Sequence, residues 1–158
     1  MCADLGPVRT TYAAAMETAR LQLTTANAII EGALAASANA GYRPMGVVVL
    51  DDSGHLVAAQ RQDGASMFRI DVATGKAWAA VGMGASSRLL AERAAANPNF
   101  FVSLASTANG RFLPQTGAVL IKDVAGHILG AAGASGGTGD EDEEICIAGV
   151  EAVGLHAG

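Results

Sequence analysis

The sequence is poor in aromatic residues and in cysteine, and these shortages exclude several classes of protein. Only 4% of the 158 residues are aromatic, and Cys2 and Cys146 are the two cysteines. They form no Cys-x-x-Cys or Cys/His spacing, so the sequence predicts neither a disulfide framework nor a structural zinc site. The three histidines also lack metal-binding spacing. We therefore predict no metal site and a reducing compartment.

Positive charge and long apolar runs are scarce as well. Ten Lys and Arg residues face fifteen Asp and Glu residues, which gives a net charge of −5 and no basic cluster. Such a chain has no electrostatic attraction to nucleic acid or to an anionic membrane surface. No segment approaches the ~18 uninterrupted apolar residues of a membrane span, and the first twenty residues lack a signal-peptide pattern. We expect a cytoplasmic protein without nucleic-acid or membrane partners.

Small apolar residues make up much of what is present. The chain is 51% hydrophobic, holds 20 glycines and is rich in alanine. Its length suits one domain with one core, and small residues allow structural elements to approach closely. Cores of this kind often continue into subunit contacts, so we predict a homo-oligomer.

The first strong helical pattern starts at Thr24 and ends before Gly41, which supplies a left-handed stop. Apolar residues recur there at the i, i+3, i+4 and i+7 spacing of one helix face. They are Ala26, Ile29, Ile30, Ala33 and Leu34. Residues 1–20 are predicted to be an arm or short helix, and residues 21–158 the domain.

Two similar hairpins follow. The first has apolar runs at 46–50 and 55–59 around an Asp/Gly turn, and the second has runs at 117–121 and 127–131 with one more turn residue. Each leads through a Gly-Ala-Ser segment into a helical pattern, near 70–81 and 145–155. Residues 87–96 predict a short helix, and 100–104 a fifth strand. We expect an antiparallel sheet of about five strands with helices packed on it.

A glycine-rich loop at 133–139 precedes the last helix, which begins near Asp140. Free N–H groups at such a place bind anions, but no P-loop lysine is present, and the acidic residues 140–144 would repel phosphate. The acids are better explained as partners of the helix dipole, with Asp140 or Asp142 as the N-cap. The glycines remain candidates for close approach of a ligand.

Arg61, Asp63 and Lys76 are the remaining candidates for chemistry. Arg61 and Asp63 form either a local ion pair at a turn or a site where Arg61 orients a ligand carboxylate. Lys76 lies near the predicted buried face, where a lysine needs a partner. It is either an amine for acid/base or imine chemistry or, more commonly, a lysine whose ammonium reaches solvent. His55 and His127 are explained by repeated hairpin geometry.

The ordered series of motifs at residues 48–65, 76–78 and 130–143 resembles the GlcG/HbpS family, also found as the C-terminal domain of PduO-type proteins. The resemblance implies a profilin-like α/β/α sandwich of three layers with a five-stranded antiparallel sheet, assembled into dimers, tetramers or octamers. It also implies haem or a related tetrapyrrole as ligand. Some haem-binding relatives supply an axial histidine from the first helix, whereas this chain has no histidine before His55. Met16, Met45, Tyr42 and His55 are the alternatives.

Two functions follow from these residues. The favoured one is a small-molecule-binding protein for haem or another flat, carboxylate-bearing ligand. Its predicted binding residues are Arg61, Gly64, Ala65, Gly133, Ser135, Gly136 and Gly137. The alternative is a cofactor-free enzyme, an isomerase, lyase or hydratase acting on a small oxygenated metabolite. Its predicted acid/base residues are Lys76, Asp63, Asp142 and Glu143.

Overall fold

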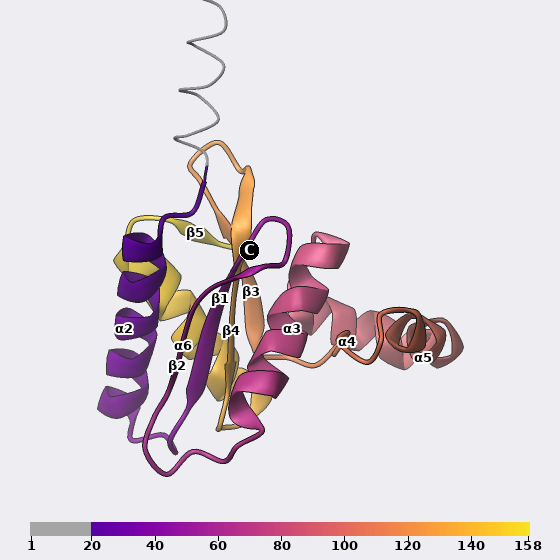
Figure 1. Cartoon of the computed structure of the whole chain (residues 1–158), viewed down its shortest axis with the longest axis horizontal. Helices are drawn as coiled ribbons and strands as arrows, with labels where there is room; N and C mark the ends of the chain where they lie inside the picture. Colours follow the sequence, from indigo (N-terminus) through magenta and orange to yellow (C-terminus); the bar gives the residue numbers. More distant parts are fainter. Residues whose placement is uncertain (1–19) are drawn as a thin grey trace, which may run out of the picture.

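Five antiparallel strands form one sheet in the order β2-β1-β4-β3-β5 in the computed structural model, which describes residues 20–158 (Figure 1). The strands are β1 (Gly46–Asp51), β2 (Leu56–Arg61), β3 (Ala118–Lys122), β4 (Ile128–Ser135) and β5 (His156–Ala157). The helices are α2 (Leu23–Ala40), α3 (Arg69–Met83), α4 (Ser87–Ala96), α5 (Pro98–Thr107) and α6 (Gly139–Ala152). The predicted arm at residues 1–20 lies almost wholly outside the described residues.

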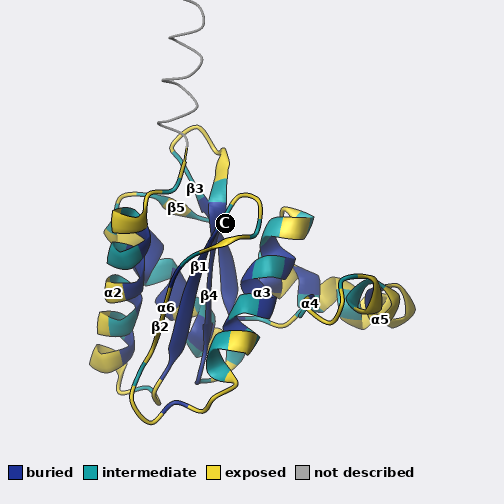
Figure 2. Cartoon of the chain, in the orientation of Figure 1, coloured by how far each residue is buried: buried dark blue, intermediate teal, exposed yellow. Residues whose placement is uncertain are grey.

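Helices cover both faces of the sheet. Helices α2 and α6 pack on one face and α3 on the other, with α4 and α5 beyond α3 (Figure 1). Alternate residues of β1 serve the two layers: Val47 and Val49 join the core under α2 and α6, while Val48 and Leu50 join the core under α3. Burial on both faces explains why the four residues from Val47 to Leu50 are all apolar (Figure 2). The predicted three-layer sandwich is confirmed.

Glycines set how closely the layers approach. A Cβ atom on Gly133 of β4 would lie 2.4 Å from the carbonyl oxygen of Ala73 in α3. A Cβ atom on Gly149 of α6 would lie 2.3 Å from the carbonyl oxygen of Ile29 in α2. Larger residues at either position would force the helices apart, so these glycines hold the layers in contact.

The predicted strand at 100–104 is wrong. These residues belong to α5, whose first turn begins with Pro98 and whose N-cap, Asn97, accepts a hydrogen bond from the backbone N–H of Phe100 at 3.5 Å. Proline at the first helical position and asparagine before it are a helix-start signal, which outweighs the short apolar run. The fifth strand is instead the two-residue β5, which pairs with the end of β3.

The two hairpin turns share one hydrogen-bonding pattern, while four residues connect the strands of the first hairpin and five those of the second, as predicted. Oδ1 of Asp51 accepts hydrogen bonds from the backbone N–H groups two and four residues later, and Oδ1 of Asp123 does the same. Nδ1 of His55 lies 3.5 Å from Asp51, and Nδ1 of His127 lies 2.9 Å from Asp123. The two histidines therefore occupy equivalent positions in their turns.

Candidate functional site

Helix α6 begins with a capping box. Its N-cap is Thr138, whose hydroxyl accepts a hydrogen bond from the N–H of Glu141 at 3.2 Å, while the Glu141 carboxylate accepts one from the N–H of Thr138 at 2.7 Å. The predicted N-caps, Asp140 and Asp142, are therefore wrong. This exchange satisfies the backbone N–H groups of Thr138 and Glu141. The other acidic residues of the segment are not part of the cap.

Two of those acids bind Arg88 of α4. The guanidinium donates hydrogen bonds to Glu143, with Nε 2.8 Å from Oε2, and also to Asp140. The hydrogen bond with Glu143 is the largest cause of a raised pKa for Arg88, which stays charged. Glu143, a predicted acid/base residue, is thus part of an ion pair with Arg88.

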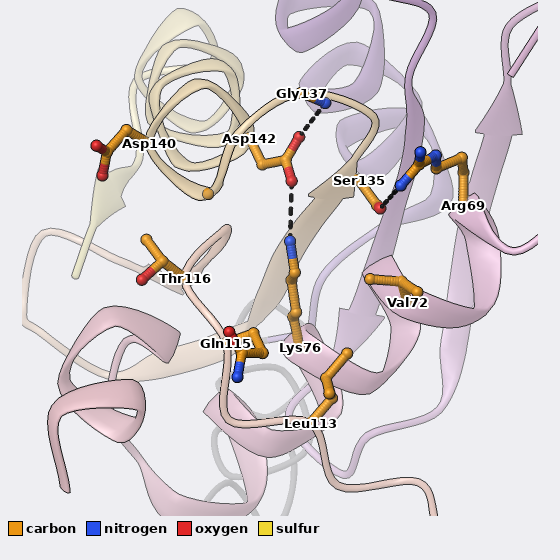
Figure 3. Close-up of a pocket in the computed structure, with 11 residues that line it drawn as sticks. Arg69, Val72, Lys76, Leu113, Gln115, Thr116, Ser135, Gly137, Asp140 and Asp142 are labelled. Carbon is orange, nitrogen blue, oxygen red and sulfur yellow. Dashed lines mark hydrogen bonds and ion pairs between the residues drawn. The ribbon is translucent and has the colours of Figure 1, made fainter. Parts of the chain in front are cut away.

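Asp142 and Lys76 form a buried ion pair between α6 and α3. Their residues are 2% and 5% exposed, and Nζ of Lys76 lies 2.9 Å from Oδ2 of Asp142 (Figure 3). Lys76 also donates to the carbonyl of Ala134 at 3.2 Å, and Oδ1 of Asp142 accepts from the N–H of Gly137 at 3.0 Å. The partner that a buried lysine requires is therefore Asp142.

The backbone behind this pair leaves no space for a side chain. Gly117 has a φ of +129°, and a Cβ atom there would lie 2.6 Å from Nζ of Lys76. The thiol of Cys146 donates a hydrogen bond to the carbonyl of Gly117, with the two atoms 3.7 Å apart. Burial raises the pKa of Cys146, so the thiol is protonated at neutral pH and is not a nucleophile.

The pair lines a pocket of about 460 Å³, which we call the Lys76 pocket. Its described lining residues are Arg69, Val72, Lys76, Leu113, Gln115, Thr116, Ser135, Gly137, Gly139, Asp140 and Asp142. Arg69 donates a hydrogen bond from Nη1 to the buried hydroxyl of Ser135 at 3.3 Å. Arg69 and Lys76 both extend from α3 toward the segment that carries Ser135 (Figure 3).

Several predicted site residues lie elsewhere. Arg61 and Asp63 line a different pocket beside Tyr42, and the Arg61 guanidinium donates to the carbonyl of Ala65. Gly64 has a φ of +83° and lies in the turn between Gln62 and Ala65. The turn interpretation of this motif is supported, although no Arg61–Asp63 ion pair forms within residues 20–158.

The predicted glycine loop divides into two parts. Gly133 lies inside β4 beneath α3, where its role is close packing, and strand β4 continues through Ser135. Gly136 is buried against the backbone of Pro44, while Gly137 lines the Lys76 pocket. Of the predicted binding residues, Ser135 and Gly137 therefore come together with Lys76 and Asp142.

Sequence reasoning missed Arg69. The signal was its spacing, because Arg69 precedes Lys76 by seven residues and therefore lies on the same face of the predicted helix. A second cation on the helix face that carries a buried lysine indicates a shared site. Arg69 could have been predicted as a site residue for that reason.

Within residues 20–158 no group of three His, Cys, Asp or Glu side chains is arranged to hold a metal ion. Among those residues, no helix is both long and apolar enough to span a membrane.

Comparison with known proteins decides the family. The family model described as haem degrading protein HbpS-like matches residues 21–151, which is most of the chain. The chain belongs to the HbpS-like family. No curated protein matches this sequence.

Solved structures share the fold of this HbpS-like protein. A PduOC:heme complex is 21% identical with a TM-score of 0.77, covering 86% of this chain and 96% of that one. A double mutant of HbpS from Streptomyces reticuli is 28% identical with a TM-score of 0.72, covering 84% and 86%. Protein ORFY from Klebsiella pneumoniae is 19% identical with a TM-score of 0.77, covering 85% and 90%.

The Lys76 pocket of this HbpS-like chain does not suit haem. None of its described lining residues is a histidine, cysteine, methionine or tyrosine, which are the usual protein ligands of haem iron. Among the predicted axial ligands, Met45 is fully buried in the core. Tyr42 donates its hydroxyl to Glu144 at 2.7 Å, and this hydrogen bond raises the pKa of Tyr42, which disfavours the phenolate. Met16 lies outside the described residues.

His55 lines a second and more apolar pocket of about 620 Å³, which we call the Trp78 pocket. Its described lining residues are Leu50, Gly54, His55, Leu56, Asp71, Val72, Thr74, Gly75, Trp78, Gly110, Arg111 and Leu113. The guanidinium of Arg111 stacks over the Trp78 ring, 4.3 Å from its centroid. An imidazole, apolar walls and a cation suit an iron-bearing, flat ligand with carboxylates.

Proposed function

We propose that this HbpS-like protein binds haem, or a related flat ligand that carries carboxylates, in the Trp78 pocket. One observation carries the proposal: a histidine and an arginine line the same largely apolar pocket. The description of the matched family names haem, and the PduOC structure of the same fold is a haem complex. Both support the choice of ligand.

Each residue has a separate role in this proposal. Nδ1 of His55 lies 3.5 Å from Oδ2 of Asp51, so Nε2 is the nitrogen available to bind iron. Trp78 contributes to the apolar wall of the pocket, and Arg111, whose guanidinium lies over the Trp78 ring, pairs with a carboxylate at the edge of the ligand. Haem bound here would supply redox chemistry at its iron.

A haemin titration followed by Soret absorbance tests the proposal. We expect a saturable shift with one haem per chain, and a loss of at least about tenfold in affinity for His55→Ala. His127→Ala is the matched control, because His127 occupies the same turn position beside Asp123 in the other hairpin. No shift, or equal effects of the two substitutions, would overturn the proposal.

Two arginine variants locate the carboxylate contact. Arg111→Ala is expected to weaken haemin binding about three- to tenfold, since an exposed charge pair contributes modestly. Arg61→Ala, at the residue that the sequence favoured, is expected to bind haemin like the unsubstituted protein. The opposite ranking would place the ligand beside Tyr42 and Asp63 instead.

The homo-oligomer of two, four or eight subunits stays a prediction, as does a cytoplasmic location. Light scattering with and without haemin measures the number of subunits.

A further inference from the structure

The Lys76 pocket contains one positive charge that no protein group neutralises. Asp142 neutralises Lys76, whereas the single charge of Arg88 is shared between Asp140 at the pocket edge and Glu143. Within residues 20–158 no carboxylate lies within ion-pairing distance of Arg69, which donates to the neutral hydroxyl of Ser135. Arg69 is therefore the cation of this pocket that can pair with a ligand anion.

The hydrogen-bonding groups of the pocket also have unused donors. An ammonium group has three donors, and Lys76 directs two of them at Asp142 and at the carbonyl of Ala134. The third has no protein acceptor among the described residues. Ser135 accepts from Arg69 and keeps its own O–H as a donor. A ligand rich in acceptor oxygens matches this arrangement.

The acids at the start of α6 narrow the class of anion. Asp140 and Asp142 line the pocket in the first turn of this helix, and their repulsion is stronger for a doubly charged phosphate than for a singly charged carboxylate. A carboxylate carries one charge and matches the planar guanidinium of Arg69 in two hydrogen bonds. The pocket volume of about 460 Å³ limits the ligand to a small molecule.

A buried ion pair is seldom needed for stability alone. Apolar residues of similar size often replace such a pair without loss of stability, because removing two charges from water is costly. Lys76 and Asp142 line an open pocket and meet glycine backbone on the opposite side. Ligand binding explains the presence of this buried ion pair, which packing alone does not explain.

We propose that the Lys76 pocket binds a short carboxylic acid with a second oxygen, a hydroxy or oxo acid. The carboxylate pairs with Arg69, and the second oxygen accepts a hydrogen bond from Nζ of Lys76. Asp142 is a positioning residue that holds the ammonium group in place. This site is independent of the haem proposal, since the described linings of the two pockets share only Val72 and Leu113.

Calorimetric titration with four-carbon acids tests each contact. The probes are butyrate, its 2-, 3- and 4-hydroxy derivatives, the amides of these acids, and inorganic phosphate. We expect at least one hydroxybutyrate to bind about tenfold more tightly than butyrate, because it adds a hydrogen bond to a charged donor. The amides and phosphate are expected to bind at least about tenfold more weakly than that acid.

Variants separate the two contacts. Arg69→Ala should weaken every acid at least about tenfold, whereas Arg93→Ala, an exposed arginine of α4, should leave binding unchanged. The double variant Lys76→Met with Asp142→Leu removes both buried charges, so it should fold and lose the preference for the hydroxy acid. The proposal is overturned if no hydroxy acid binds better than butyrate, if phosphate binds equally well, or if Arg69→Ala retains full affinity.

Discussion

At the scale of single residues, Lys76 is the side chain that most depends on its partner. It is one of two lysines, and the other, Lys122, lies at the end of edge-proximal strand β3. Nζ of Lys76 is satisfied by one carboxylate oxygen and one carbonyl oxygen, both inside the fold. Loss of the ammonium group would leave the carboxylate of Asp142 buried without its counter-ion.

We therefore expect Lys76→Met to lower the free energy of unfolding by about 3 to 5 kcal/mol. The double variant with Asp142→Leu should recover most of this loss, because it removes the unpaired charge as well. Urea denaturation followed by circular dichroism measures both values. A single variant as stable as the unsubstituted protein would show that Asp142 has another partner or is protonated.

The sequence predicts both residues but not the contact between them. The helical spacing places Lys76 near a buried face and requires a partner for it, while Asp142 is predicted either as a dipole charge or as one of the acid/base residues. Its position held the missing signal, since Asp142 precedes Ile145, Cys146 and Gly149 by three, four and seven residues on the buried face of α6. An acid on such a face needs a buried cation.

At the scale of elements, the start of α6 positions the carboxylate of Asp142. The capping box ends the loop after β4 and orients the first turn, in which Asp142 accepts the N–H of Gly137. The cap and the ion pair therefore share one short segment. A weaker cap should affect both stability and the pocket.

Thr138→Ala removes the hydroxyl that accepts from Glu141, and we expect it to cost about 1 kcal/mol of unfolding free energy. Thr107→Ala is the matched control, because the exposed Thr107 hydroxyl bonds only back to Ser103 within α5. That change should be neutral or slightly stabilising. Thermal unfolding of both variants distinguishes them, and equal losses would contradict a capping role.

Most elements could be predicted from local pattern, and two could not. Helices α2, α3 and α4 and both hairpins follow from apolar spacing and turn residues. The run at 100–104 is short and apolar, and such runs do not distinguish strand from helix. Strand β5 is two residues long and exists through its pairing with β3, which no local pattern encodes.

At the scale of the whole molecule, the Lys76 pocket exists because distant segments meet. Lys76 and Asp142 are 66 residues apart, and the geometry between them depends on how closely α3 lies on β4. Sequence spacing predicts both hairpin-helix units, but it does not predict how closely α3 of the first unit packs on β4 of the second. Gly133 sets that distance, since its hydrogen faces the backbone of Ala73.

Gly133→Ala is expected to push α3 away from the sheet and cost about 1 to 3 kcal/mol. Because α3 carries Arg69 and Lys76, the same change should weaken hydroxybutyrate binding, although Gly133 is not among the described lining residues of the pocket. Leu120→Ala in the same core should cost about 2 to 5 kcal/mol by leaving a cavity, without displacing the helix. Calorimetric titration with hydroxybutyrate, at a temperature at which both variants are folded, measures the two affinities. If the Gly133→Ala variant binds hydroxybutyrate as tightly as the Leu120→Ala variant, the placement of α3 does not control the pocket.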